Sequence, residues 1–161
     1  MKRLLEFVAI AVLAVVASGP LLAQSQSNPL VGTWKLNVAK SQYSPGPAPT
    51  SLTRTVVAQG DGMKYTMEGV AADGTKLAYG FTVKYDGTDF PITGSMPGGA
   101  DSIAIKKIDS NHYEATLKKA GKVIGTSKAE ISMDGKVTTL TSEGTNEGGQ
   151  PTNNVAVYDK Q

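Results

Sequence analysis

Residues 76–85 read Lys-Leu-Ala-Tyr-Gly-Phe-Thr-Val-Lys-Tyr, and this stretch decides the fold of the chain. Every second side chain is apolar or aromatic, from Leu77 through Phe81 to Tyr85, while the positions between them carry lysine, threonine or a small residue. A period of two residues is typical of a β-strand with one face in the core and the other in water. The stretch therefore predicts a half-buried strand.

The same alternation continues along the chain. It governs residues 63–68 and 112–118, whereas no segment after the N-terminal region places apolar residues at helical spacing. Asp-Gly dipeptides, which suit tight hairpin turns, stand at 61–62, 73–74, 86–87 and 134–135. Strands are expected over about 31–38, 52–58, 63–70, 75–85, 88–93, 101–108, 112–119, 122–132, 136–143 and 153–159. Short strands joined by tight turns predict an all-β domain, an antiparallel up-and-down β-barrel of about 8–10 strands.

Two segments interrupt this rhythm. Residues 44–49 carry alternate prolines, which remove backbone donors and exclude both a helix and a central strand. Residues 94–99 are rich in glycine. Each segment is expected to be a surface connection, either passive or folded as a flap over one barrel end, and the passive interpretation is favoured because most loops only connect.

The N-terminus has the order of a secretory signal peptide. Lys2 and Arg3 precede an apolar stretch at 7–17, and small residues follow up to Ala23. The stretch is shorter than the roughly 20 apolar residues of a membrane span, so an uncleaved anchor is disfavoured. We expect a signal peptide over 1–23, a single domain over 24–161, and export to the periplasm or the extracellular space.

Composition excludes several classes of partner. Removal of Lys2, Arg3 and Glu6 lowers the 16 basic and 14 acidic side chains to 14 and 13, a net charge of +1 with the signs interspersed. Such a balance is not that of a protein that binds nucleic acid or an anionic membrane. The chain has no cysteine, so disulfides and a lipid anchor on cysteine are excluded. The oligomeric state stays open.

Gly32-Thr33-Trp34 opens the first expected strand and resembles the Gly-x-Trp signature of the calycins, the superfamily of lipocalins and fatty-acid-binding proteins. In that superfamily the tryptophan closes one end of an antiparallel barrel. Trp34, Leu36 and Val38 share one face of the expected strand, as this role requires. Residues 155–160 are similar to the last strand of fatty-acid-binding proteins, and the chain resembles still more closely a group of small exported bacterial lipocalin-like proteins. The resemblance implies a lipocalin-like barrel over 24–161.

The chain departs from fatty-acid-binding proteins in two places. Those proteins have two short helices between their first two strands, where this chain has the proline-rich segment. Their last strand carries Arg-x-Tyr to bind a carboxylate, and the matching residues here are Ala156 and Tyr158. Their carboxylate clamp is therefore not inherited.

Catalytic and metal-binding patterns are not found. His112 is the one histidine and is expected on an outer strand face, so neither a catalytic triad nor a transition-metal site is predicted. The carboxylates of Asp86 and Asp89 are expected in a hairpin turn and not in a calcium loop. We expect no cofactor, no metal and no enzymatic activity.

Arg54 is the only arginine after the N-terminal region, and it shares a strand face with Leu52 and Val56. If that face lines a cavity, Arg54 is a buried cation that needs an anionic partner. The favoured alternative is an arginine at the end of a strand that reaches solvent along its own stem.

The candidate lumen residues are those expected on the inward faces. They are Arg54, Met63, Tyr65, Met67, Tyr79, Phe81, Tyr113 and Tyr158, with Thr139 and Thr141 as further polar groups. A barrel of this size is either filled by side chains or holds one small ligand, and core packing is favoured for each residue.

The leading hypothesis is an extracytoplasmic, non-enzymatic binder of a small hydrophobic or amphipathic molecule. The alternative is a protein-interaction module with a filled core that acts through loops or a sheet edge. An enzyme at the barrel mouth is a third possibility. An outer-membrane barrel is rejected, because the expected outer faces carry Lys64, Lys76, Lys84 and Glu114 where lipid requires apolar residues.

Overall fold

A computed structural model describes residues 28–161, so the expected signal peptide lies outside the described residues. The described part of the chain is almost entirely β-strand, with one short 3-10 turn, η1 (Val38–Lys40). The strands are β1 (Gly32–Leu36), β2 (Gln42–Ser44), β3 (Ser51–Gln59), β4 (Gly62–Val70), β5 (Lys76–Val83), β6 (Asp86–Gly94), β7 (Ser102–Lys107), β8 (His112–Lys119), β9 (Lys122–Ile131), β10 (Val137–Thr145) and β11 (Pro151–Lys160). Within residues 28–161 no helix has the length and apolarity needed to cross a membrane.

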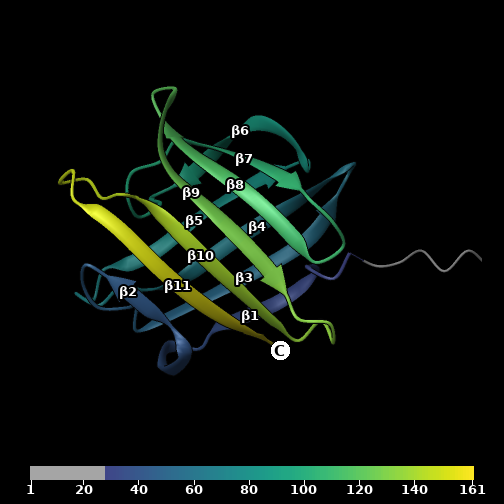
Figure 1. The fold of residues 1–161 in the computed structure, drawn as a ribbon, viewed down its shortest axis with the longest axis horizontal. Helices are drawn as coiled ribbons and strands as arrows, with labels where there is room; N and C mark the ends of the chain where they lie inside the picture. The colour runs from purple at the N-terminus through teal and green to yellow at the C-terminus, as the bar shows by residue number, and fades with distance from the viewer. Residues whose placement is uncertain (1–27) are drawn as a thin grey trace, which may run out of the picture.

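The strands form a closed antiparallel barrel (Figure 1). Neighbours in sequence pair from β3 through β11, and β1 pairs with both β3 and β11, which closes a barrel of ten strands. The short strand β2 lies outside this ring and pairs with Asn153–Val155 of β11. The predicted fold class, an all-β antiparallel up-and-down barrel of about 8–10 strands, is confirmed.

Two expected element boundaries are wrong at the start of the barrel. The first strand ends at Leu36 instead of residue 38, because the Asn37 side chain accepts a hydrogen bond from the Lys40 amide at 3.1 Å and turns the chain into η1. Val38 therefore leaves the barrel face and is 42% exposed. The proline-rich segment begins inside a strand, since Ser44 pairs with Asn153.

Two expected hairpin turns are also displaced. Gln59 pairs with Gly62, so the turn is formed by residues 60 and 61. Asp86 already belongs to β6, where the register shifts between Asp86 and Asp89 as in a β-bulge. The Asp86 carboxylate accepts from the Thr88 amide at 2.9 Å and stabilises this irregularity.

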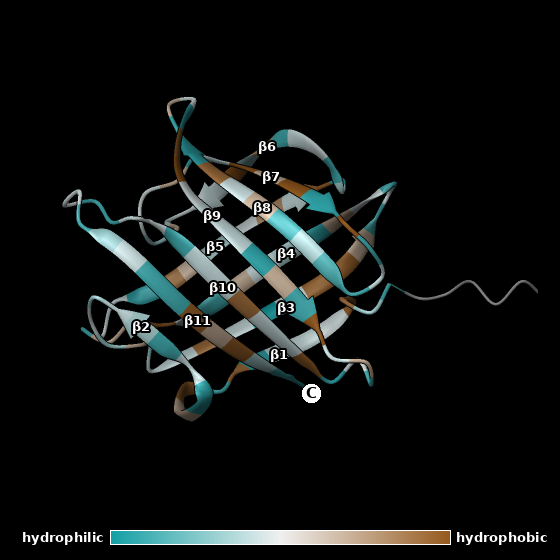
Figure 2. Ribbon diagram, in the orientation of Figure 1, coloured by the Kyte–Doolittle hydropathy of each residue, from teal (hydrophilic) through white to brown (hydrophobic). Residues whose placement is uncertain are grey.

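The alternation read from residues 76–85 places the core inside the barrel. Hydrophobic and hydrophilic residues alternate along the strands in Figure 2. Trp34 is fully buried and Phe81 is 8% exposed, so both side chains lie in the interior. The expectation for β10 is wrong by one residue, because Thr138 and Leu140 point inward and Thr141 is exposed. A slip of one residue exchanges the two faces of a strand.

The barrel has two different ends. At one end the segment before β1 covers the interior, and Leu30 is buried there at 3% exposure; we call this the Trp34 end. The connections over 37–50, 71–75, 95–101, 120–121 and 146–150 gather at the other end, which we call the mouth.

Candidate functional site in the barrel interior

The Trp34 end is sealed by a set of specific contacts. The Trp34 indole Nε1 donates to the Leu30 carbonyl at 2.8 Å, and Lys160 Nζ lies 5.0 Å from the centre of the indole ring. Lys160 Nζ also donates to the Pro29 carbonyl at 2.9 Å. A Cβ at Gly32 would lie 2.9 Å from Lys160 Cε, so the glycine leaves room for the lysine stem. These contacts give the Gly-x-Trp pattern a physical reason: Trp34 covers the interior at this end, and Gly32 leaves room for the Lys160 side chain beside it.

A deep chamber of about 140 Å³ lies between the strands. Its walls are mainly apolar and aromatic, and seven of the eight predicted lumen residues line it. The predicted residues on the wall are Arg54, Tyr65, Met67, Tyr79, Phe81, Tyr113 and Tyr158. Met63, the remaining candidate, is half-buried against the core and does not line this chamber.

A second chamber of about 380 Å³ lies at the mouth. Both interrupting segments contribute to it, through Pro47 and Pro49 from one and Met96 and Pro97 from the other. Both segments therefore contribute to the wall of the chamber at the mouth. Residues that line both chambers show that the two adjoin; they are Tyr79, Met96, Leu117, Leu140, Ser142 and Tyr158.

Arg54 does not reach solvent, so the favoured sequence interpretation is wrong. Its side chain comes from β3, between Leu52 and Val56 on the inward face, and the residue is 7% exposed. The guanidinium carbon lies 4.6 Å from the centre of the Tyr158 ring and 5.5 Å from that of Trp34. Within residues 28–161, Nε and Nη2 are buried without a hydrogen-bond partner. A buried cation is held here by aromatic faces and not by a carboxylate.

The tyrosines form the other polar part of the interior. The hydroxyl oxygens of Tyr65 and Tyr85 lie 2.7 Å apart and share a hydrogen bond. The Tyr113 hydroxyl is buried without a partner among the described residues. Burial raises the pKa of Tyr113 to about 12, and burial also raises the pKa of Tyr158 although the charge of Arg54 opposes it. The tyrosines are therefore neutral donors and acceptors at physiological pH.

Several wall residues were missed by the sequence interpretation. Leu117 and Leu140 are not among the predicted lumen residues, and the segments that contain Pro47, Pro49 and Met96 were expected to be surface connections. The number of strands between the two interrupting segments could have shown that they lie together. In an up-and-down barrel, connections separated by an even number of strands lie at the same end, and four strands separate these two segments. This rule brings the two interrupting segments together at the mouth.

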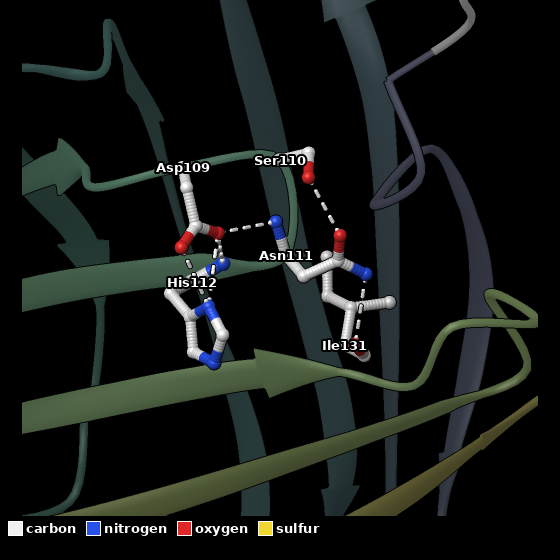
Figure 3. Close-up of polar contacts among 5 residues, drawn as sticks. All are labelled: Asp109, Ser110, Asn111, His112 and Ile131. Carbon is white, nitrogen blue, oxygen red and sulfur yellow. Dashed lines mark hydrogen bonds and ion pairs between the residues drawn. The ribbon is translucent and has the colours of Figure 1, made fainter.

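His112 lies outside the cavity, as expected. It is exposed near the Trp34 end, where its Nδ1 is 2.9 Å from both carboxylate oxygens of Asp109 (Figure 3). Ser110 Oγ donates to Asn111 Oδ1 at 2.7 Å and not to the imidazole, so Asp109, Ser110 and His112 do not form a catalytic triad. Hydrogen bonds from the Asn111 amide and from His112 lower the pKa of Asp109, which supports a role as a turn cap.

No protein-family model matches the chain, and no curated protein does. Among solved structures, Rv2717c from M. tuberculosis is 17% identical, with a TM-score of 0.50 over 83% of this chain and 93% of that one. Zebrafish ileal bile acid-binding protein complexed with cholic acid is 15% identical, with a TM-score of 0.48 over 83% of this chain and 99% of that one. Lobster apocrustacyanin A1 is 12% identical, with a TM-score of 0.42 over 84% of this chain and 63% of that one. The similarity to Rv2717c supports the barrel fold and, at this identity, the fold alone.

Proposed function

We propose that this chain is a small exported bacterial lipocalin-like protein that binds a small hydrophobic or amphipathic molecule inside its barrel and catalyses no reaction. The observation that carries the proposal is the pair of adjoining chambers, of about 140 and 380 Å³. Ligand sites are concave, mostly apolar and provided with a few polar groups that fix orientation. The interior has this character, since aromatic and aliphatic walls surround Arg54 and the Tyr113 hydroxyl.

The interior favours binding over the alternatives. A filled-core interaction module needs no chamber, whereas side chains here leave space that continues to the mouth. Besides Arg54 and tyrosines, the polar side chains that line the deep chamber are Glu114, Ser127 and Ser142. Within residues 28–161 neither serine hydroxyl is hydrogen-bonded to the Glu114 carboxylate, so these residues do not form an activated nucleophile.

The cavity can be tested by filling it. Ala129 lines the deep chamber from β9, while the adjacent Lys128 is exposed on the outer face. We expect Ala129→Phe to weaken binding of the uncharged dye N-phenyl-1-naphthylamine about tenfold or more, because the ring occupies the chamber. Lys128→Phe, which adds the same side chain outside the barrel, should leave dye binding unchanged. Dye emission excited through Trp34, the single tryptophan, measures the affinity.

Two results would contradict the proposal. One is absence of saturable dye binding together with absence of any small molecule that copurifies with the protein from its native source. The other is an equal effect of both phenylalanine substitutions, which would place the dye on the outer surface.

The proposed export can be tested by determining the N-terminal residue of the protein that is recovered outside the cytoplasm. Cleavage after Ala23 predicts that the protein recovered outside the cytoplasm begins at Gln24, which intact-mass measurement determines. Recovery of the chain with residues 1–23 intact and attached to the membrane would contradict this part of the proposal.

A further inference from the structure

Arg54 is an unusual residue for the interior of a barrel. A buried charge is ordinarily paired with an opposite charge, since removing an ion from water is unfavourable and an ionic partner offsets most of that cost. Among residues 28–161 the side chain has no ion pair, and it is 7% exposed. The aromatic faces of Tyr158 and Trp34 offset only part of this cost.

The two nitrogens of Arg54 that have no hydrogen-bond partner have the geometry to bind one kind of acceptor. Nε and Nη2 form one edge of the guanidinium, and their N–H bonds point in parallel, at the spacing of the two oxygens of a carboxylate. The central carbon of the guanidinium lies 4.6 Å from the centre of the Tyr158 ring, a contact that leaves the edge of the group free. This edge is therefore available to a bidentate acceptor.

The position of Arg54 sets the direction of the ligand. Arg54 lines the deep chamber and not the mouth chamber, whereas its neighbour on the same face, Leu52, lines the mouth chamber. An anionic group held by Arg54 lies inside the barrel, and an attached apolar chain extends past Leu117 and Leu140 towards the mouth.

We propose that the ligand is an amphipathic monocarboxylate, bound with its carboxylate on the Nε–Nη2 edge of Arg54 and its apolar chain directed to the mouth. This inference rests on the proposed function, and it names the class of molecule. One carboxylate neutralises one guanidinium. A dianion such as a phosphate monoester would leave an unpaired negative charge in an apolar chamber, because the other buried polar side chain besides tyrosines in the described residues is Thr138.

Three probes with the same chain test the charge requirement: octanoate, octan-1-ol and octylammonium, each displacing N-phenyl-1-naphthylamine from the wild-type protein near neutral pH. We expect octanoate to bind about tenfold or more tighter than octanol, as for a hydrogen-bonded charge pair, and octylammonium to bind most weakly. Equal affinity for octanoate and octanol would overturn the inference while the proposed function stands. Failure of the dye and of all three probes to bind would contradict the proposed function itself.

Substitutions of Arg54 test whether its guanidinium is the group that binds the carboxylate. Arg54→Met has a similar length and no charge, and we expect it to abolish the preference for octanoate over octanol. Arg54→Lys keeps the charge and lacks the planar edge, so its preference should be intermediate. Lys128→Met removes one positive charge from the outer face of β9 and should retain the full preference.

Retention of the preference by Arg54→Met would overturn the inference. If that variant does not fold, the comparison of wild type with Arg54→Lys decides, and equal preference in the two would overturn the bidentate contact.

Discussion

At the scale of single residues, the interior is organised by two cations that share one aromatic ring. Lys160 and Arg54 lie 5.0 and 5.5 Å from the Trp34 ring centre. Lys160 also donates a hydrogen bond to the Pro29 carbonyl, whereas Nε and Nη2 of Arg54 have no partner among the described residues. Lys160 therefore helps to close the Trp34 end of the barrel, whereas the burial of Arg54 has a cost in stability that the proposed carboxylate would offset.

This difference predicts opposite effects on stability. Arg54→Met should raise the free energy of unfolding of the ligand-free protein by about 1–3 kcal/mol, because the desolvation cost of a buried ion exceeds its attraction to the aromatic rings. Lys160→Met should lower it by about 1–3 kcal/mol, because the Pro29 carbonyl loses a charged donor. Urea unfolding followed by Trp34 fluorescence measures both. Destabilisation by Arg54→Met comparable to that by Lys160→Met would show that the guanidinium is structural.

At the scale of elements, one strand junction depends on a glycine. β5 and β6 pair over only three positions, from Tyr79–Gly94 to Phe81–Ile92, and Gly94 ends the ladder with φ +82°. A Cβ at Gly94 would overlap the Ala78 carbonyl oxygen and lie 2.9 Å from Tyr79 Cα. Since Tyr79 lines both chambers, the approach of β6 at Gly94 also fixes a wall of the cavity.

We expect Gly94→Ala to destabilise the barrel by about 2–4 kcal/mol, from the positive φ and from the overlap with backbone atoms. Gly74→Ala is the matched control, because Gly74 has φ +85° but open space around its Cα, and it should cost only about 1 kcal/mol. Thermal or urea unfolding of both variants separates the two contributions. Equal losses would mean that the strand contact is not tight in solution.

At the scale of the whole molecule, all six tyrosines belong to the barrel interior or its rim. Burial raises the pKa of each of them above the usual value of 10, to about 12 for Tyr113. The unfolded chain releases these protons first, at a pH near 10. The stabilisation is therefore complete below pH 10 and is lost as the pH rises through the folded pKa values.

We expect the barrel to keep its full stability up to about pH 10 and then to lose about 1.4 kcal/mol per pH unit for each tyrosine that stays protonated in the folded state. Tyrosinate absorbance near 295 nm and Trp34 fluorescence should change together, since ionisation is coupled to unfolding. Titration of most tyrosines near pH 10 with unchanged fluorescence would contradict the buried arrangement.

Much of this architecture could be predicted from local pattern. The two-residue period around Phe81 identified a half-buried strand, and its recurrence, with turn residues between, predicted the barrel. The predicted strand boundaries were wrong where side-chain hydrogen bonds to the backbone overrode the hydrophobic alternation. Asn37 turns the chain into η1 two residues early, and Asp86 stabilises a bulge where a turn was expected. In β10 a one-residue shift brought Thr138 inward in place of Thr139, since that run has no strong alternation.

The sequence by itself determined the class of fold and the inward faces of Trp34, Tyr65, Phe81 and Tyr113, because each follows from periodicity within one strand. Only the tertiary structure decided that Arg54 is buried against Tyr158 from β11, and that the loops over 44–49 and 94–99 line one chamber. These contacts join segments far apart in the chain, and their geometry depends on barrel closure and register, which no local pattern encodes.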